Sequence, residues 1–172
     1  MQGQERDDYW SEPLPPEFLP ADSVEDENLR FLLAHWRGLR GARPWPARAD
    51  ISPKALKQCL RVIHLYDVVD GGAEFRARLV GTAVYPGLIE DQTGKFVSEH
   101  PDPGVRLRFS AAMKQVLAAG EPVRTVSRRL TGTRLHDART EGLWLPLGAP
   151  DGIEQILAGS SLHFVPPGHV AA

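Results

Sequence analysis

The sequence has little of what common catalytic and metal sites require. It contains one cysteine, Cys59, which excludes an internal disulfide and any zinc site built from several cysteines. Its six histidines show neither H-x-x-x-H nor H-E-x-x-H spacing, and no phosphate-binding loop surrounds Gly81, Gly87 or residues 93–95. No nucleophile stands beside a base, and no paired carboxylates mark a cleft. We therefore expect no catalytic residues, no metal site and no enzymatic activity.

Long apolar runs are also missing. No stretch approaches the roughly 18 residues that a membrane-spanning helix needs. The first ten residues, MQGQERDDYW, have neither the basic nor the apolar part of a signal peptide. The 172 residues suit one domain, and a hydrophobic fraction of 42% with a charged fraction of 24% is typical of globular proteins. We expect a cytoplasmic protein without membrane insertion.

Charge is distributed unevenly along the chain. Residues 1–27 carry nine Asp and Glu residues against one basic residue, which leaves residues 28–172 with 19 basic and 13 acidic side chains. Arg124, Arg128 and Arg129 fall on one expected edge strand, where positive charge also prevents unwanted strand pairing. That explanation is simpler than binding to phosphates, so we do not expect a nucleic-acid partner.

The N-terminal part is expected to hold a tail and one helix. Residues 1–21 are acidic and rich in proline and have no helical or strand period, which predicts a flexible tail. Asp22 and Ser23 are the expected N-cap of a helix over residues 24–40. A helix of this length is marginal alone in water, so its apolar stripe must pack on a sheet or on a second copy. We predict a homodimer through this stripe: Leu29, Leu32, Leu33 and Trp36.

A proline-rich linker and a short helix at about Pro53 to Leu60 complete the expected N-terminal region, residues 22–60. Arg48 and Asp50 are expected to pin the linker to the domain. Cys59 is expected in a buried position on the short helix.

The core is expected over residues 61–165, followed by a C-terminal tail over 166–172. Two strands, Val62 to Val69 and Phe75 to Thr82, flank the hairpin signal Asp70-Gly71-Gly72. Strict alternation puts side chains of the second strand on two faces. One face should carry Phe75, Ala77 and Leu79, and the other Arg76, Arg78 and Val80.

A longer helix and three strands are expected to follow. Asp102 is the expected cap, Pro103 occupies the first turn and Gly120 ends the helix. One face of this helix is apolar and carries Phe109, Ala112, Met113 and Val116. The strands are expected at about Val123 to Thr131, Leu143 to Leu147 and Ile153 to Phe164.

Several short sequence segments support this order of elements and resemble those of a known family. The segments are HWRGLRG, WPARADISP, YDVV, FRARLVGT, DQTGK, LWLPL and ILAGS, which together cover about residues 28–162. They resemble a family of small bacterial proteins made of a single PAS domain with an N-terminal helix. The resemblance implies an α+β PAS fold, in which a five-stranded antiparallel sheet carries short helices on one face, a long connecting helix and an N-terminal amphipathic helix.

The resemblance also implies a function in signalling, with a protein partner. The residues that match the family's motifs are expected to be fold determinants in the first place and ligand contacts only in the second: Arg48, Asp50, Arg78, Gly81, Thr93 and Gly94. We predict a non-enzymatic regulatory module that acts through protein contacts. The alternative is a sensor that binds an anionic metabolite or cofactor in the cup of the fold.

Candidate ligand contacts in that cup are His64, Tyr66, Arg78, Tyr85 and Trp144. Arg78 would favour a carboxylate if it pointed inward, whereas pairing with Asp67 or Asp50 would make it structural.

The identity of any cofactor stays unknown from the sequence, and flavin and haem are not expected. Cys59 precedes the first strand, away from the position that a flavin photosensor uses. His100, the one candidate haem ligand on the helical wall, is expected in a surface loop.

Overall fold

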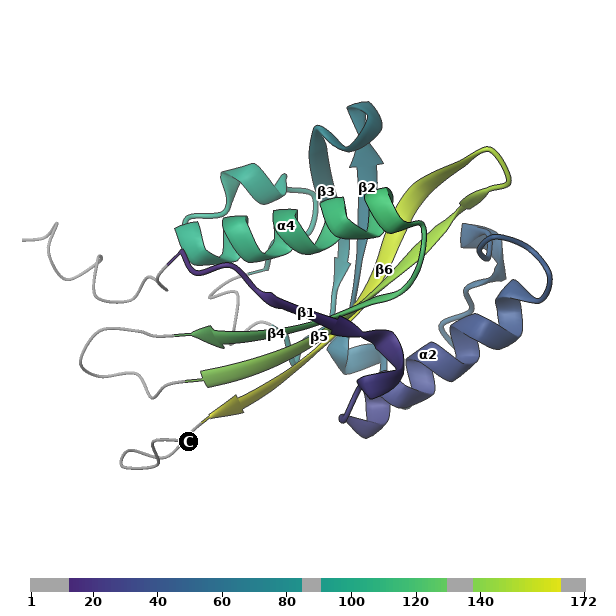
Figure 1. Ribbon diagram of the computed structural model, residues 1–172, viewed down its shortest axis with the longest axis horizontal. Helices are drawn as coiled ribbons and strands as arrows, with labels where there is room; N and C mark the ends of the chain where they lie inside the picture. Colours follow the sequence, from purple (N-terminus) through teal and green to yellow (C-terminus); the bar gives the residue numbers. More distant parts are fainter. Residues whose placement is uncertain (1–12, 85–90, 130–137, 165–172) are drawn as a thin grey trace, which may run out of the picture.

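The structure is a computed structural model that describes residues 13–84, 91–129 and 138–164 (Figure 1). Its centre is a six-stranded antiparallel sheet in the order β1-β4-β5-β6-β2-β3. The strands are β1 (Glu17–Pro20), β2 (Ile63–Val69), β3 (Glu74–Val80), β4 (Val123–Arg129), β5 (Ala138–Ala149) and β6 (Gly152–Phe164). The α-helices are α2 (Glu27–Arg40) and α4 (Pro103–Ala119). Short 3₁₀ turns lie at η1 (Ala21–Ser23), η2 (Arg48–Asp50), η3 (Leu60–Val62), η4 (Asp70–Gly72) and η5 (Val97–Glu99).

The five expected strands and both expected longer helices are present, and β1 is an addition. It pairs with β4 from Glu17 opposite Val126 to Pro20 opposite Val123. An edge strand tolerates a proline because its outward N–H has no ladder partner to lose. The end of the expected flexible tail is therefore a strand, while residues 1–12 lie outside the described part of the chain.

The two α-helices lie on opposite faces of the sheet (Figure 1). The apolar stripe of α2 is buried against β5 and β6 by Leu29, Leu32, Leu33 and Trp36, each at most 5% exposed. Trp36 Nε1 also donates a hydrogen bond of 2.8 Å to the carbonyl of Pro146. The predicted dimer interface on this stripe is wrong, because the chain's own sheet covers it.

Helix boundaries differ from expectation at two places. Asp26, and not Asp22 or Ser23, caps α2, and its Oδ1 accepts hydrogen bonds from the N–H groups of the second and third helical residues. The prediction of a short helix over residues 53–60 is also wrong. Cys59 N–H donates to Leu56, three residues earlier, so this segment forms successive turns that lead into η3. Cys59 is buried as expected.

The start and end of α4 agree with the sequence. Asp102 Oδ1 accepts from Gly104 N–H at 2.8 Å, Pro103 is the first residue, and Gly120 ends the helix with φ of 64°. The expected apolar face packs on the sheet through Phe109, Ala112, Met113 and Val116.

A β-bulge in β3 overturns the expected strict alternation. Leu65 pairs with Leu79 while Tyr66 pairs with Ala77, so Arg78 is an extra residue without a partner on β2. Leu79 therefore turns to the α2 face, where it is 45% exposed. Val80 was expected on the face opposite Ala77, but it joins Ala77 in the core under α4.

Candidate functional site

The candidate site is the cup between α4 and the sheet, where four rings from three elements meet. His64 and Tyr66 come from β2, Phe109 from α4 and Trp144 from β5. The ring of His64 lies 5.3 to 5.6 Å, centroid to centroid, from each of the other three. Edge-to-face geometry dominates, which is favourable for aromatic pairs.

Hydrogen bonds join the polar atoms of these rings. His64 Nδ1 lies 3.0 Å from the Tyr66 hydroxyl, and His64 Nε2 lies 2.8 Å from the Ser160 hydroxyl. Trp144 Nε1 donates to Thr125 Oγ1 at 2.8 Å. Burial lowers the pKa of His64 to about 3, so the ring is neutral and has one donor and one acceptor nitrogen for its two partners. Burial also raises the pKa of the Tyr66 phenol.

Little space remains beside the rings. A cavity of about 50 Å³ lies at the mouth of the cup. Ligand sites commonly have volumes of about 300–1,000 Å³, so this cavity has room for a few water molecules. The polar and charged residues that line it are Arg108, Thr125, Ser127, Thr140, Glu141 and Ser160.

Three of the five candidate ligand residues meet in the cup: His64, Tyr66 and Trp144. Arg78 does not. It lies on the opposite face of the sheet with its side chain 58% exposed, and its Nε is 3.0 Å from Asp67 Oδ2. Its interpretation as a cup contact is therefore wrong, because Arg78 forms the structural pair with Asp67. Tyr85 lies outside the described residues.

Sequence reasoning missed the hydroxyl groups of Thr125 and Ser160. The available signal was polar side chains on cup-facing positions of otherwise apolar strands, as Ser160 follows Ala158 by two residues.

Gly81, Thr93 and Gly94 have structural roles in close backbone contacts and turns. A Cβ on Gly81 would lie 2.3 Å from the carbonyl oxygen of Arg61, so no larger residue fits without a shift. Thr93 donates to Asp91 Oδ1 through both its N–H and its hydroxyl. Gly94, with φ of 85°, donates its N–H to the carbonyl of Ala77 on β3.

Arg48 and Asp50 bond within their own turn rather than to the domain. Asp50 Oδ2 accepts from Ala47 N–H at 2.8 Å and pairs with Arg43 at 2.9 Å, and the first of these is the main cause of its lowered pKa. Arg48 bonds the carbonyl of Ile51 at 3.4 Å.

Other residues attach the linker to the sheet. Trp45 Nε1 donates to the carbonyl of Ala149, and Gly148 N–H donates to the carbonyl of Pro46.

His100 is buried, which corrects the expected surface position. It is 2% exposed, and its Nδ1 accepts a hydrogen bond of 3.0 Å from Asp102 N–H.

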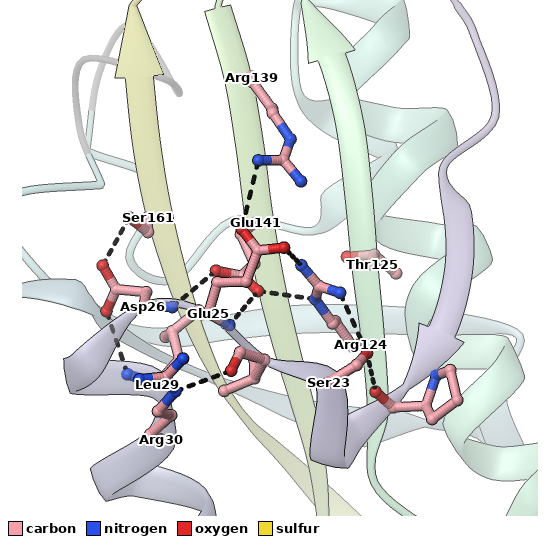
Figure 2. Close-up of polar contacts among 12 residues, drawn as sticks. Ser23, Glu25, Asp26, Leu29, Arg30, Arg124, Thr125, Arg139, Glu141 and Ser161 are labelled. Carbon is pink, nitrogen blue, oxygen red and sulfur yellow. Dashed lines mark hydrogen bonds and ion pairs between the residues drawn. The ribbon is translucent and has the colours of Figure 1, made fainter.

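A second polar cluster, the α2 anchor, joins the start of α2 to the sheet (Figure 2). Arg124 Nε lies 2.6 Å from Glu141 Oε1, and both side chains are 5% exposed. The carboxylate of Glu141 also accepts from the N–H groups of Glu25 and Asp26, at 2.8 and 3.0 Å. Ser161 donates to the capping carboxylate of Asp26 at 2.9 Å.

Arg124 also corrects the interpretation of the arginines on β4. Because β1 pairs with β4, Arg124 does not lie on an edge strand. It donates to Ser23 Oγ and pairs with Glu25, and its hydrogen bond is the main cause of the lowered pKa of Glu25. Arg124 therefore binds the N-terminal segment through Ser23 and Glu25.

The described residues hold neither a metal-binding cluster nor a membrane-spanning helix. In the described ranges, no three His, Cys, Asp or Glu side chains gather closely enough to hold a metal ion. Neither α-helix of the described chain has the length and hydropathy of a membrane span.

Comparison with known proteins gives the family. No curated protein matches the sequence. A solved chain titled "Structure of an RNA-binding Light-Oxygen-Voltage Receptor" is 14% identical with a TM-score of 0.46, over 88% of this chain and 39% of that chain. A family model described as "PAS domain" matches residues 24–161, from the segment before α2 into β6. Since this match takes in most of the sequence, the chain belongs to the PAS domain family of sensory and signalling modules.

Proposed function

We propose that this protein is a non-enzymatic signalling module that acts in the cytoplasm through contacts with another protein. The observation that carries this proposal is that the chain's own side chains fill the cup. His64 has both ring nitrogens hydrogen-bonded inside the protein, and the space left beside it measures about 50 Å³. A ligand of drug size would have to displace this network, whereas a partner at the surface would leave it intact.

Filling the remaining cavity tests this proposal. Ser127 lines the cavity and is 8% exposed, so Ser127→Leu removes the space with little effect on the outer surface. We expect affinity capture from the native host to recover the same partner with wild type and with Ser127→Leu. Reconstitution from the purified components then establishes direct binding. The proposal fails if the wild type recovers no partner that binds directly.

The second candidate function is sensing of a small anionic metabolite. The hydroxyl groups of Thr125, Ser127, Thr140 and Ser160 and the guanidinium of Arg108 around the cavity favour it. A thermal-shift screen of small carboxylates and phosphates separates the two functions. A sensor would be stabilised by one compound, and Ser127→Leu would abolish that shift, whereas the interaction module predicts no shift in either protein.

A further inference from the structure

A larger groove, here called the outer groove, lies on the α2 face of the sheet. It measures about 440 Å³ and runs between the segment 48–61 and the strands β2 and β3. Its apolar floor and walls are formed by Ile51, Leu56, Ile63, Leu65, Leu79 and Leu157. The helix α2 packs on β5 and β6, so neither α-helix of the described residues lies over this end of the same face.

The bulge in β3 contributes an exposed apolar side chain to the outer groove. Without the extra residue Arg78, strict alternation would turn Leu79 towards the core under α4. The bulge instead places Leu79 in the outer groove at 45% exposure. Bulges commonly re-aim a side chain next to a functional site. An exposed leucine in an apolar hollow is a typical contact for a partner.

Positive charge borders the outer groove. Arg48 and Arg61 line it, and Lys54 and Lys57 are exposed on the same segment. Asp50 is the segment's one acidic residue, and Arg43 already pairs with it. Among the described residues, none of these four cations forms an ion pair, and no Asp or Glu lines the outer groove. The border is therefore an uncompensated basic edge beside an apolar floor.

We infer that the outer groove docks a segment of a partner protein in which large apolar side chains stand next to several Asp or Glu residues. The apolar side chains would cover Leu79 and the floor, and the carboxylates would meet the basic edge. Cations spread along residues 48–61 complement several carboxylates, whereas a fatty acid would offer one. This inference rests on the proposed function and assigns it a surface.

A peptide selection with the full chain tests the inference. Random 16-residue peptides displayed on phage are selected on immobilised wild type, and one enriched peptide is synthesised for titration by fluorescence anisotropy. We expect enriched peptides to combine Leu, Phe or Trp with Asp or Glu. Enrichment of basic or wholly polar peptides contradicts the inference.

Matched variants assign the binding surface. Leu79→Asp, and the double variant Arg48→Glu with Arg61→Glu, should each weaken peptide binding by on the order of tenfold or more. The controls are Leu107→Asp, a similarly exposed leucine on α4, and Arg128→Glu, an exposed arginine on β4. Both controls should bind like wild type. If the controls lose binding and the groove variants keep it, the groove assignment fails while the interaction module stands.

Other occupants give distinct results. A fatty acid that copurifies with wild type and is absent from Leu79→Asp in native mass spectrometry would overturn the inference. A dimer that Leu79→Asp converts to monomers in sedimentation would assign the groove to a second copy and also overturn it. If wild type retains neither a peptide nor a host partner, the proposed function fails together with the inference.

Discussion

Arg124 Nε and Glu141 Oε1 lie 2.6 Å apart in a pair that is buried on both sides. The same carboxylate accepts the N–H groups of Glu25 and Asp26, just before α2 begins. A side chain of β5 therefore fixes where the N-terminal helix starts and how it meets the sheet. Glu25 and Glu141 are 116 positions apart in the sequence, and no local pattern indicates that they bond.

Glu141→Ala should destabilise the protein by about 3–5 kcal/mol, because it leaves a buried guanidinium without its main partner. Urea unfolding measures this loss. Glu121→Ala is the control, since Glu121 is 60% exposed and lies 3.6 Å from Arg40. The control should lose at most about 1 kcal/mol. Equal losses in the two variants would contradict the structural role of the α2 anchor.

Acid should destabilise the cup through His64. Its folded pKa of about 3 lies below its ordinary value of 6.5, so between these values the unfolded chain binds a proton that the folded chain does not. Stability is therefore full above pH 6.5 and falls as the pH decreases. Between pH 7 and 5 we expect a loss of about 2 kcal/mol from this group. His64→Gln should show a shallower pH dependence in urea unfolding, and identical slopes would contradict a neutral, buried His64.

Gly81→Ala should be strongly destabilising, because the added Cβ would lie 2.3 Å from the backbone oxygen of Arg61. Gly38→Ala is the opposite case. Gly38 lies within α2 with nothing within 4 Å of an added Cβ, and alanine favours a helix by about 0.8–1 kcal/mol over glycine. Thermal unfolding should therefore shift down for the first variant and up for the second. A neutral Gly81→Ala would show that the close approach of strand and turn is not needed.

Leu33→Ala should cost about 2–5 kcal/mol of folding stability, because Leu33 is buried against the chain's own sheet. Leu107→Ala, at an exposed site on α4, should change stability by less than about 0.5 kcal/mol. Urea unfolding at several protein concentrations separates the two explanations of the stripe. A loss for Leu33→Ala that depends on protein concentration would restore the dimer interface on α2.

The sequence predicted the parts of the fold that depend on local chemistry. Asp102, Pro103 and Gly120 bound α4 as their capping preferences indicate, and the apolar stripe of α2 packs on the sheet. Strand-like runs separated by turn signals located the five core strands. These signals need no knowledge of distant residues, which is why they were sufficient.

The wrong predictions concern features that depend on pairing with residues distant in the sequence. The β1 pairing depends on β4, more than 100 residues away, and it turns Arg124 from an expected edge residue into a buried anchor. The bulge at Arg78 depends on how β2 pairs with β3, and it moved both Leu79 and Val80 from their expected faces. In the cup, His64, Tyr66 and Trp144 were anticipated together, but their mutual packing and the hydroxyl of Ser160 were not.

Native mass spectrometry of the protein isolated gently from its own host distinguishes a protein-binding module from a small-molecule sensor. We expect a complex of the 19.0 kDa chain with a second polypeptide and no small molecule attached to the chain. A chain that carries a stoichiometric small molecule and no polypeptide partner would contradict this expectation.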